Sequence, residues 1–90
     1  ELVSPDTHRQ LELVWFELDP GHELSEGMMA HPGEEQAIVL AGTMHLLIGD
    51  ETYILEAGDS ITFDCSVPHR VENHGSARLV QLSAITPPRY

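Results

Sequence analysis

The sequence has no lysine and only four arginines against 15 acidic residues, which gives a formal net charge of −11. Nucleic-acid binding relies on Lys and Arg that neutralise phosphates, and anionic membrane surfaces attract basic segments in the same way. The chain also lacks any apolar run near the ~20 residues of a spanning helix. We therefore expect this domain to make no direct contact with nucleic acid or with a membrane.

Cysteine is almost absent, since Cys65 is the only one, and this excludes an internal disulfide. That composition favours a reducing, cytoplasmic location. Aromatic residues make up only 6% of the chain, but 41% of its 90 residues are hydrophobic. This is enough for one compact domain and too little for two. The chain does not begin with Met, so we expect a fragment or a processed form of a longer protein.

Short apolar runs separated by turn residues fill most of the chain, and no run shows a sustained helical period. Turn signals include Gly49-Asp50 and Gly58-Asp59. The pattern predicts an all-β protein, an antiparallel sandwich or barrel. We expect an irregular lead-in at 1–10 and a single domain at 11–90. The expected strands are 11–18, 35–40, 43–48, 51–55, 60–63, 69–72 and 77–85.

The first of these strands, with the sequence LELVWFEL, is apolar on both faces. Leu13 and Trp15 point one way, whereas Val14 and Phe16 point the other. A monomer would expose one of these faces, and large exposed apolar patches usually mark interfaces. The strand therefore predicts a homodimer.

Polar residues with metal-binding chemistry occur in two segments. His31 and Glu35 lie four residues apart around a Pro-Gly turn, and His69 begins a strand much later in the chain. Asn73, four residues further on, faces the same side of that strand as His69. Imidazoles and a carboxylate converging inside a small barrel would suit a divalent metal.

The two segments resemble the paired motifs of the cupin superfamily. The first motif, His-x-His, three or four residues, Glu, six residues, Gly, is matched by Met29-Ala-His31, Glu35 and Gly42. The second motif, Gly, five residues, Pro-x-Gly, two residues, His, three residues, Asn, is matched from Gly58 to Asn73. Asp64 and Ser66 replace the Pro and Gly of the second motif. The resemblance implies a double-stranded β-helix, or jelly-roll, barrel over nearly the whole chain.

The resemblance also implies a site. Three of the four usual metal-ligand positions are filled, by His31, Glu35 and His69, while Met29 stands in the first His position. These three residues could hold Zn, Ni, Mn or Fe with water completing the shell, or form a buried polar network without metal. Either way, they are the predicted ligand-binding centre, with Asn73 in support.

A narrower resemblance links the chain to the C-terminal domain of helix-turn-helix cupin regulators, through the run HPGEEQAIVLAGTMHLLIGDETYILEAGD, then PHRVEN and TPPRY. It implies a sensor domain that binds a small-molecule effector, with DNA bound by another part of the regulator. The alternatives are a stand-alone metal-dependent enzyme of the dioxygenase, isomerase or epimerase type, and a module that only dimerises a partner domain. No catalytic residue is assigned.

The sequence also predicts the setting of three further residues. His45, in mid-strand, could line the pocket from another wall or face outward. Cys65 is interpreted as a small loop residue without nucleophilic character. Gly42 follows a strand directly, so we expect it in a turn with positive φ.

Overall fold

The computed structural model describes residues 11–25 and 27–87, which form seven β-strands and no helix. The predicted strands are confirmed, with ends displaced by at most two residues. The expected lead-in at 1–10 lies outside the described residues. No described helix is long and apolar enough to cross a membrane. The strands are β1 (Glu12–Leu18), β2 (Glu34–Ala41), β3 (Thr43–Ile48), β4 (Glu51–Glu56), β5 (Ser60–Asp64), β6 (His69–Glu72) and β7 (Leu79–Thr86).

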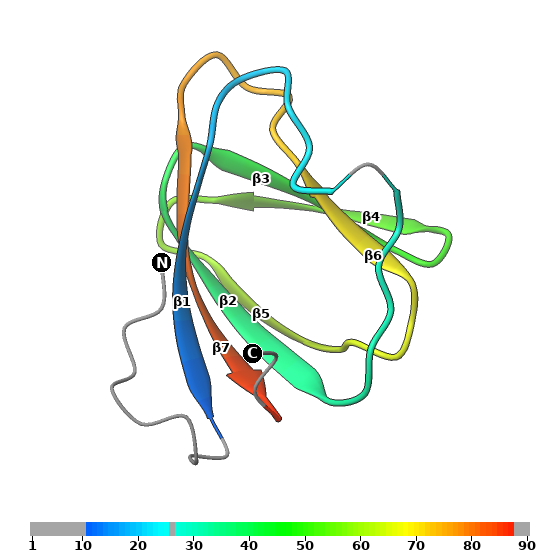
Figure 1. The fold of residues 1–90 in the computed structure, drawn as a ribbon. Helices are drawn as coiled ribbons and strands as arrows, with labels where there is room; N and C mark the ends of the chain where they lie inside the picture. Colours follow the sequence, from blue (N-terminus) through cyan, green and yellow to red (C-terminus); the bar gives the residue numbers. More distant parts are fainter. Residues whose placement is uncertain (1–10, 26, 88–90) are drawn as a thin grey trace.

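The strands form two antiparallel sheets that enclose a core, as Figure 1 shows. One sheet has the order β1-β7-β2-β5 and the other the order β4-β3-β6. The first and last strands pair along their whole length, from Glu12 opposite Ile85 to Leu18 opposite Leu79. The predicted all-β antiparallel barrel is therefore confirmed.

Strict alternation along β2 and β7 determines which side chains enter the barrel. Every second residue of β7 is buried, from Leu79 to Ile85, and Ala37 and Val39 are buried on β2. Successive side chains of a strand point to opposite faces of the sheet, so this pattern arises when one face covers a core and the other faces solvent. The hydrophobic core contains Ala37, Val39, Met44, Leu46, Leu55, Phe63, Cys65, Val71 and Leu79.

Gly42 makes the tight connection between β2 and β3. Its φ of +79° lies in the left-handed region, as expected from the sequence. A Cβ atom there would meet the backbone oxygen of Arg78 at 2.6 Å. The turn therefore needs glycine both for its backbone conformation and for the close approach of the chain before β7.

The segment between β1 and β2, cyan in Figure 1, runs beside β6. The Leu24 amide donates to the Val71 carbonyl at 2.9 Å, and the Met29 and His69 backbones exchange hydrogen bonds of 2.7 and 2.8 Å. The sequence predicts no strand in this segment. The backbone contacts make this segment a partial fourth member of the smaller sheet and carry His31 toward His69.

The outer face of the larger sheet is apolar at its centre. Trp15 lies opposite Leu82, which lies opposite Ile38, so the three form one row across β1, β7 and β2. Beside this row, Leu13 is 38% exposed and Leu40 is 45% exposed. We call these five residues the outer apolar face. It agrees with the expectation that β1 is apolar on both sides.

Candidate functional site

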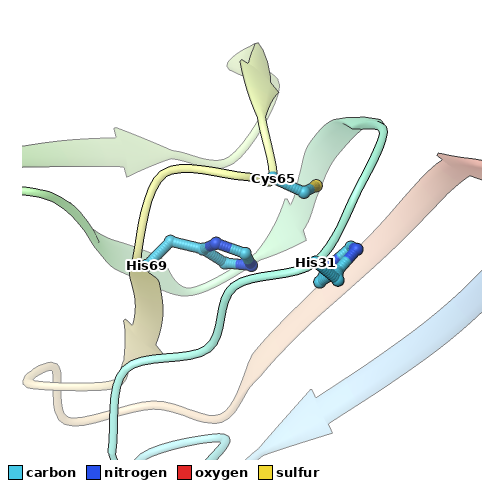
Figure 2. Close-up of side chains that lie close together, drawn as sticks. All are labelled: His31, Cys65 and His69. Carbon is cyan, nitrogen blue, oxygen red and sulfur yellow. The ribbon is translucent and has the colours of Figure 1, made fainter.

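Three side chains with metal-binding chemistry gather at one end of the barrel. One nitrogen each of His31 and His69 and the Sγ of Cys65 all lie within 4.8 Å of one another. Figure 2 shows that they come from three places: the segment before β2, the turn after β5 and the start of β6. His69 and Cys65 are buried, and His31 is half-buried. We call these three residues the His-Cys-His cluster.

The turn that carries Cys65 is built by its two neighbours. The Asp64 carboxylate accepts hydrogen bonds from the Ser66 amide at 2.9 Å and the Ser66 hydroxyl at 2.7 Å. These bonds lower the pKa of Asp64. A side chain that binds the backbone two residues on forms an Asx turn. Asp64 and Ser66 thus build the turn at the positions where the motif has Pro and Gly.

The same turn is held to the segment that carries His31. The His31 amide donates to the Cys65 carbonyl, and the Cys65 amide donates to the Gly33 carbonyl, both at 2.9 Å. These two backbone bonds fix the relative positions of His31 and Cys65. Sequence reasoning missed Cys65, because a turn position gives no periodic signal of which way the side chain points.

The imidazole of His69 has a defined orientation. Its Nδ1 lies 2.9 Å from the Val67 carbonyl oxygen, which can only accept, so Nδ1 carries the proton. The ring packs edge-on against Phe63, with centroids 5.1 Å apart, and against His31 at 5.4 Å. The proton on Nδ1 leaves Nε2 as the acceptor or metal-binding atom.

Met29 occupies the motif position of the missing histidine and pairs directly with His69. Residues directly opposite in an antiparallel pair project from the same face of the sheet, with Cβ atoms about 4.5–5.5 Å apart. The Met29 side chain therefore leaves the backbone on the same face as the His69 imidazole.

Glu35 lies at the same end of the barrel but outside the His-Cys-His cluster. It is 8% exposed and pairs across the sheet with Phe63, the ring that packs on His69. The structure therefore brings together two of the three predicted ligands, His31 and His69, and adds Cys65 as the third member of the group.

Asn73 is buried on the same face of its segment as His69, as expected, but at the opposite end of β6. Four residues of extended chain separate the two by about 13 Å. Its amide nitrogen donates to the carbonyls of Leu18 and Ala77, at 2.8 and 2.9 Å. Its oxygen accepts from the Gly75 amide at 2.9 Å. Asn73 thus fastens the ends of β1 and β6 to the chain before β7.

His45 points away from the barrel interior. It alternates with the buried Met44 and Leu46, and its ring packs against His74 with centroids 4.7 Å apart. On this outer surface a hydrogen bond from His74, together with Arg70, lowers the pKa of Glu72 against the opposing effect of burial. Of the two positions left open by the sequence, His45 takes the outward one.

The barrel interior holds further polar side chains. Gln81 and Ser83, both on β7, are almost fully buried, and the Gln81 amide donates to the Ser83 hydroxyl at 3.2 Å. The Gln81 side-chain oxygen is buried without a hydrogen-bond partner.

A separate open hollow lies on the outer face of the larger sheet. It is lined by Leu11, Glu34, Gln36, Thr62, Ala84 and Thr86.

Comparison with known proteins agrees with this architecture. The model of the cupin domain family matches residues 14–85, from within β1 to within β7. The chain belongs to the cupin family. The two motifs that suggested the family lie within this match, and the deviations at Met29, Asp64 and Ser66 are features of this cupin.

The curated relatives are transcriptional regulators. The cupin is 32% identical over 80 residues to the HTH-type transcriptional regulator PuuR of Escherichia coli, which covers 89% of this chain and 43% of the regulator. The chain thus spans less than half the length of the curated relatives it matches.

Solved structures share the fold. The cupin domain of an XRE family transcriptional regulator from Enterobacter cloacae superposes with a TM-score of 0.85 at 23% identity, covering 99% of this chain and 95% of that one. A putative sugar phosphate isomerase from Acidithiobacillus ferrooxidans gives 0.73 at 29% identity, covering 87% and 51%.

Proposed function

We propose that this cupin is the effector-binding sensor domain of a bacterial transcriptional regulator whose DNA-binding part lies outside the 90 residues. The identity to PuuR over 80 residues supports this. The charge of −11 supports the assignment of DNA binding to another part of the regulator, because a domain without lysine is a poor partner for phosphates. A regulator that acts on genes also accounts for the cytoplasmic location expected from the sequence.

The main structural support for effector binding is the side-chain oxygen of Gln81, which has no hydrogen-bond partner. An acceptor left buried without a partner costs about 1–3 kcal/mol, and Gln81 is 1% exposed. A polar effector with an N–H or O–H group aimed at this oxygen would recover that free energy. Barrel mouths and interiors are common sites for small ligands.

The effector would lie between Gln81 and the His-Cys-His cluster. In this proposal His31, Glu35 and His69 line one end of the ligand site, and Ser83 lies between that end and Gln81. Asn73 supports the site indirectly, through the backbone that it fastens at the far end of β6. The family's motif positions support these assignments.

A thermal-shift screen of the 90-residue chain against amino acids, sugars, sugar phosphates and carboxylic acids tests the proposal. A ligand at 100 times its Kd stabilises by about 2.7 kcal/mol. For a domain of this size that raises Tm by roughly 10–20 °C. Native mass spectrometry of the purified chain would show a retained ligand directly.

The matched variants are Gln81→Leu, which removes the unpartnered acceptor, and Ile54→Ala, which changes an exposed side chain on β4. The shift should vanish in Gln81→Leu and persist in Ile54→Ala. A ligand that stabilises all three proteins equally binds elsewhere and would contradict the proposed interior site.

We further propose that the sensor is a homodimer that buries the outer apolar face. Its five residues present aliphatic and indole groups across three strands. Regulators that bind paired half-sites are two-fold dimers, which require a self-complementary patch. A second copy of this face would provide one.

An enzyme is the second candidate, supported by the likeness to the putative sugar phosphate isomerase and by the His-Cys-His cluster. Turnover of a sugar phosphate by the metal-loaded chain, lost in His69→Ala, would favour the enzyme over the sensor. Binding of a small molecule without turnover would favour the sensor.

A further inference from the structure

We propose that His31, Cys65 and His69 form a site for a thiophilic metal ion, Zn²⁺ or Cu⁺, in which Cys65 takes the place that the sequence motif assigns to Glu35. The site shares His31 and His69 with the effector site proposed above, but metal binding itself requires no effector. It follows from the donor atoms that the fold brings together, two imidazole nitrogens and one sulfur within 4.8 Å.

The geometry is close to what such an ion needs. Zn–N bonds of about 2.0–2.1 Å and Zn–S bonds of about 2.3 Å place neighbouring donors about 3.5 Å apart in a tetrahedral shell. From the 4.8 Å limit, the widest separation must therefore contract by up to about 1.3 Å. Cys65 is fully buried and His69 is 2% exposed, whereas His31 is half-buried. Of the three side chains, His31 is the most exposed and therefore has the most room to move.

His69 is already oriented for binding. The Val67 carbonyl takes the Nδ1 proton, so Nε2 presents its lone pair. Histidines that bind metals typically donate their other ring N–H to a carbonyl or carboxylate in this way. The packing of Phe63 against the ring holds this orientation.

The sulfur determines the class of ion. Thiolate ligands select Zn²⁺ and Cu⁺, while carboxylate and water ligands suit Mn²⁺. Binding converts the Cys65 thiol to a thiolate, and its proton passes to the buffer. The net charge of −11 favours the approach of any cation.

Met29 adds a donor for one of the two ions. It leaves the backbone on the same face as His69, directly opposite it. A thioether binds Cu⁺ and contributes little to Zn²⁺. We therefore expect four protein donors for Cu⁺ and three for Zn²⁺, with a solvent molecule as the fourth ligand of Zn²⁺.

The test uses the 90-residue chain, reduced without added thiols and kept free of oxygen. Zn²⁺ is titrated by calorimetry, Co²⁺ by absorption, and Cu⁺ by competition with a chromophoric chelator. We expect one ion per chain and a thiolate-to-cobalt charge-transfer band in the near ultraviolet. Cys65→Ser should abolish the band and lower Zn²⁺ affinity by more than about 100-fold, above the usual cost of losing an outer-shell partner.

Three matched variants complete the design. Glu35→Gln should retain the cobalt band, and His22→Ala, on an exposed loop, should leave both affinities unchanged. Met29→Leu should weaken Cu⁺ binding by at least about tenfold and leave Zn²⁺ binding unchanged. Circular dichroism and melting curves check that each variant is folded.

The proposal is overturned if the folded wild type binds none of the three ions at micromolar concentration. It is also overturned if Cys65→Ser binds as tightly as wild type, or if Glu35→Gln abolishes binding and Cys65→Ser does not. Equal Cu⁺ affinities of Met29→Leu and wild type would remove Met29 from the donor set. None of these measurements depends on an effector or on DNA.

Discussion

Met29 and His69 face each other across two backbone hydrogen bonds, and each residue both donates and accepts. This pairing explains how a methionine can stand at a ligand position without disturbing the fold. The backbone bonds, and not the side chain, fix the place of the segment beside β6.

Met29→His should therefore add an imidazole on the same face as His69. We expect Zn²⁺ and Ni²⁺ affinity to rise by at least about tenfold, because a fourth protein ligand would replace solvent. Calorimetry on wild type and variant measures this. Equal affinities would mean that position 29 does not face the His-Cys-His cluster.

Gly42→Ala should destabilise the fold by more than about 2 kcal/mol. The φ of +79° strains any other residue, and the new methyl group would meet the Arg78 oxygen at 2.6 Å. Urea unfolding gives the free energy. Gly58→Ala is the control for strain without a clash, with φ of +95° and open space around it, and should cost about 1–2 kcal/mol. If both variants unfold alike, the close approach of Arg78 has no energetic consequence.

Asn73→Ala should lower the free energy of unfolding by about 2–4 kcal/mol. The change leaves the carbonyls of Leu18 and Ala77 and the Gly75 amide without their partner. Zn²⁺ affinity of the folded fraction should be unchanged, since the His-Cys-His cluster lies at the other end of β6. Chemical denaturation and calorimetry separate the two effects. Lost metal affinity in a stably folded variant would place Asn73 in the site instead.

Ile38→Glu should convert the proposed homodimer to a monomer, because it places a charge on the outer apolar face. Light scattering should give the 10.0 kDa of one chain for the variant and twice that mass for wild type. Ile54→Glu is the control, since Ile54 is 60% exposed on β4 of the other sheet. A wild type of 10.0 kDa at micromolar concentration would refute the dimer.

Glu72 should contribute to the fall in the stability of the fold at acid pH. The hydrogen bond from His74, with Arg70 beside it, holds the pKa of Glu72 below its usual value in the folded state. A lowered pKa stabilises the fold above the unfolded pKa, and this stabilisation disappears as the pH falls through the folded pKa. Glu72→Gln should therefore lower Tm at pH 7 and make Tm less dependent on pH below about 4.5. Thermal melts of wild type and variant from pH 7 to pH 3 measure both the Tm at pH 7 and its pH dependence. If Tm changes with pH in the same way in the two proteins, Glu72 has no such effect.

Local signals predicted the strands well, because each is short and ends at a turn residue. Gly49-Asp50 closes the hairpin between β3 and β4 where expected, and Gly42 has the predicted positive φ. Long-range backbone pairing was the part that local signals could not show. Nothing in the run around Met29 alternates like a strand, so its pairing with His69 was visible only in the structure.

The site was partly predictable for the same reason. His31 and His69 followed from motif spacing, and the structure brings them together. Cys65 depends on the turn made by Asp64 and Ser66, where no periodicity orients a side chain. Glu35 and Asn73 lie on the expected faces, but a face does not show which atoms a side chain contacts.

The antiparallel pairing of β1 with β7 has a topological consequence. Because Glu12 lies opposite Ile85, the entry and exit of the barrel are neighbours, with Cα atoms about 4.5–5.5 Å apart. A linker of a few residues could join them into a continuous ring, and the ring could be opened instead at the exposed Gly49-Asp50 hairpin. The architecture is thus compatible with circular permutation. A domain attached before β1 and one attached after β7 would emerge at the same end of the barrel.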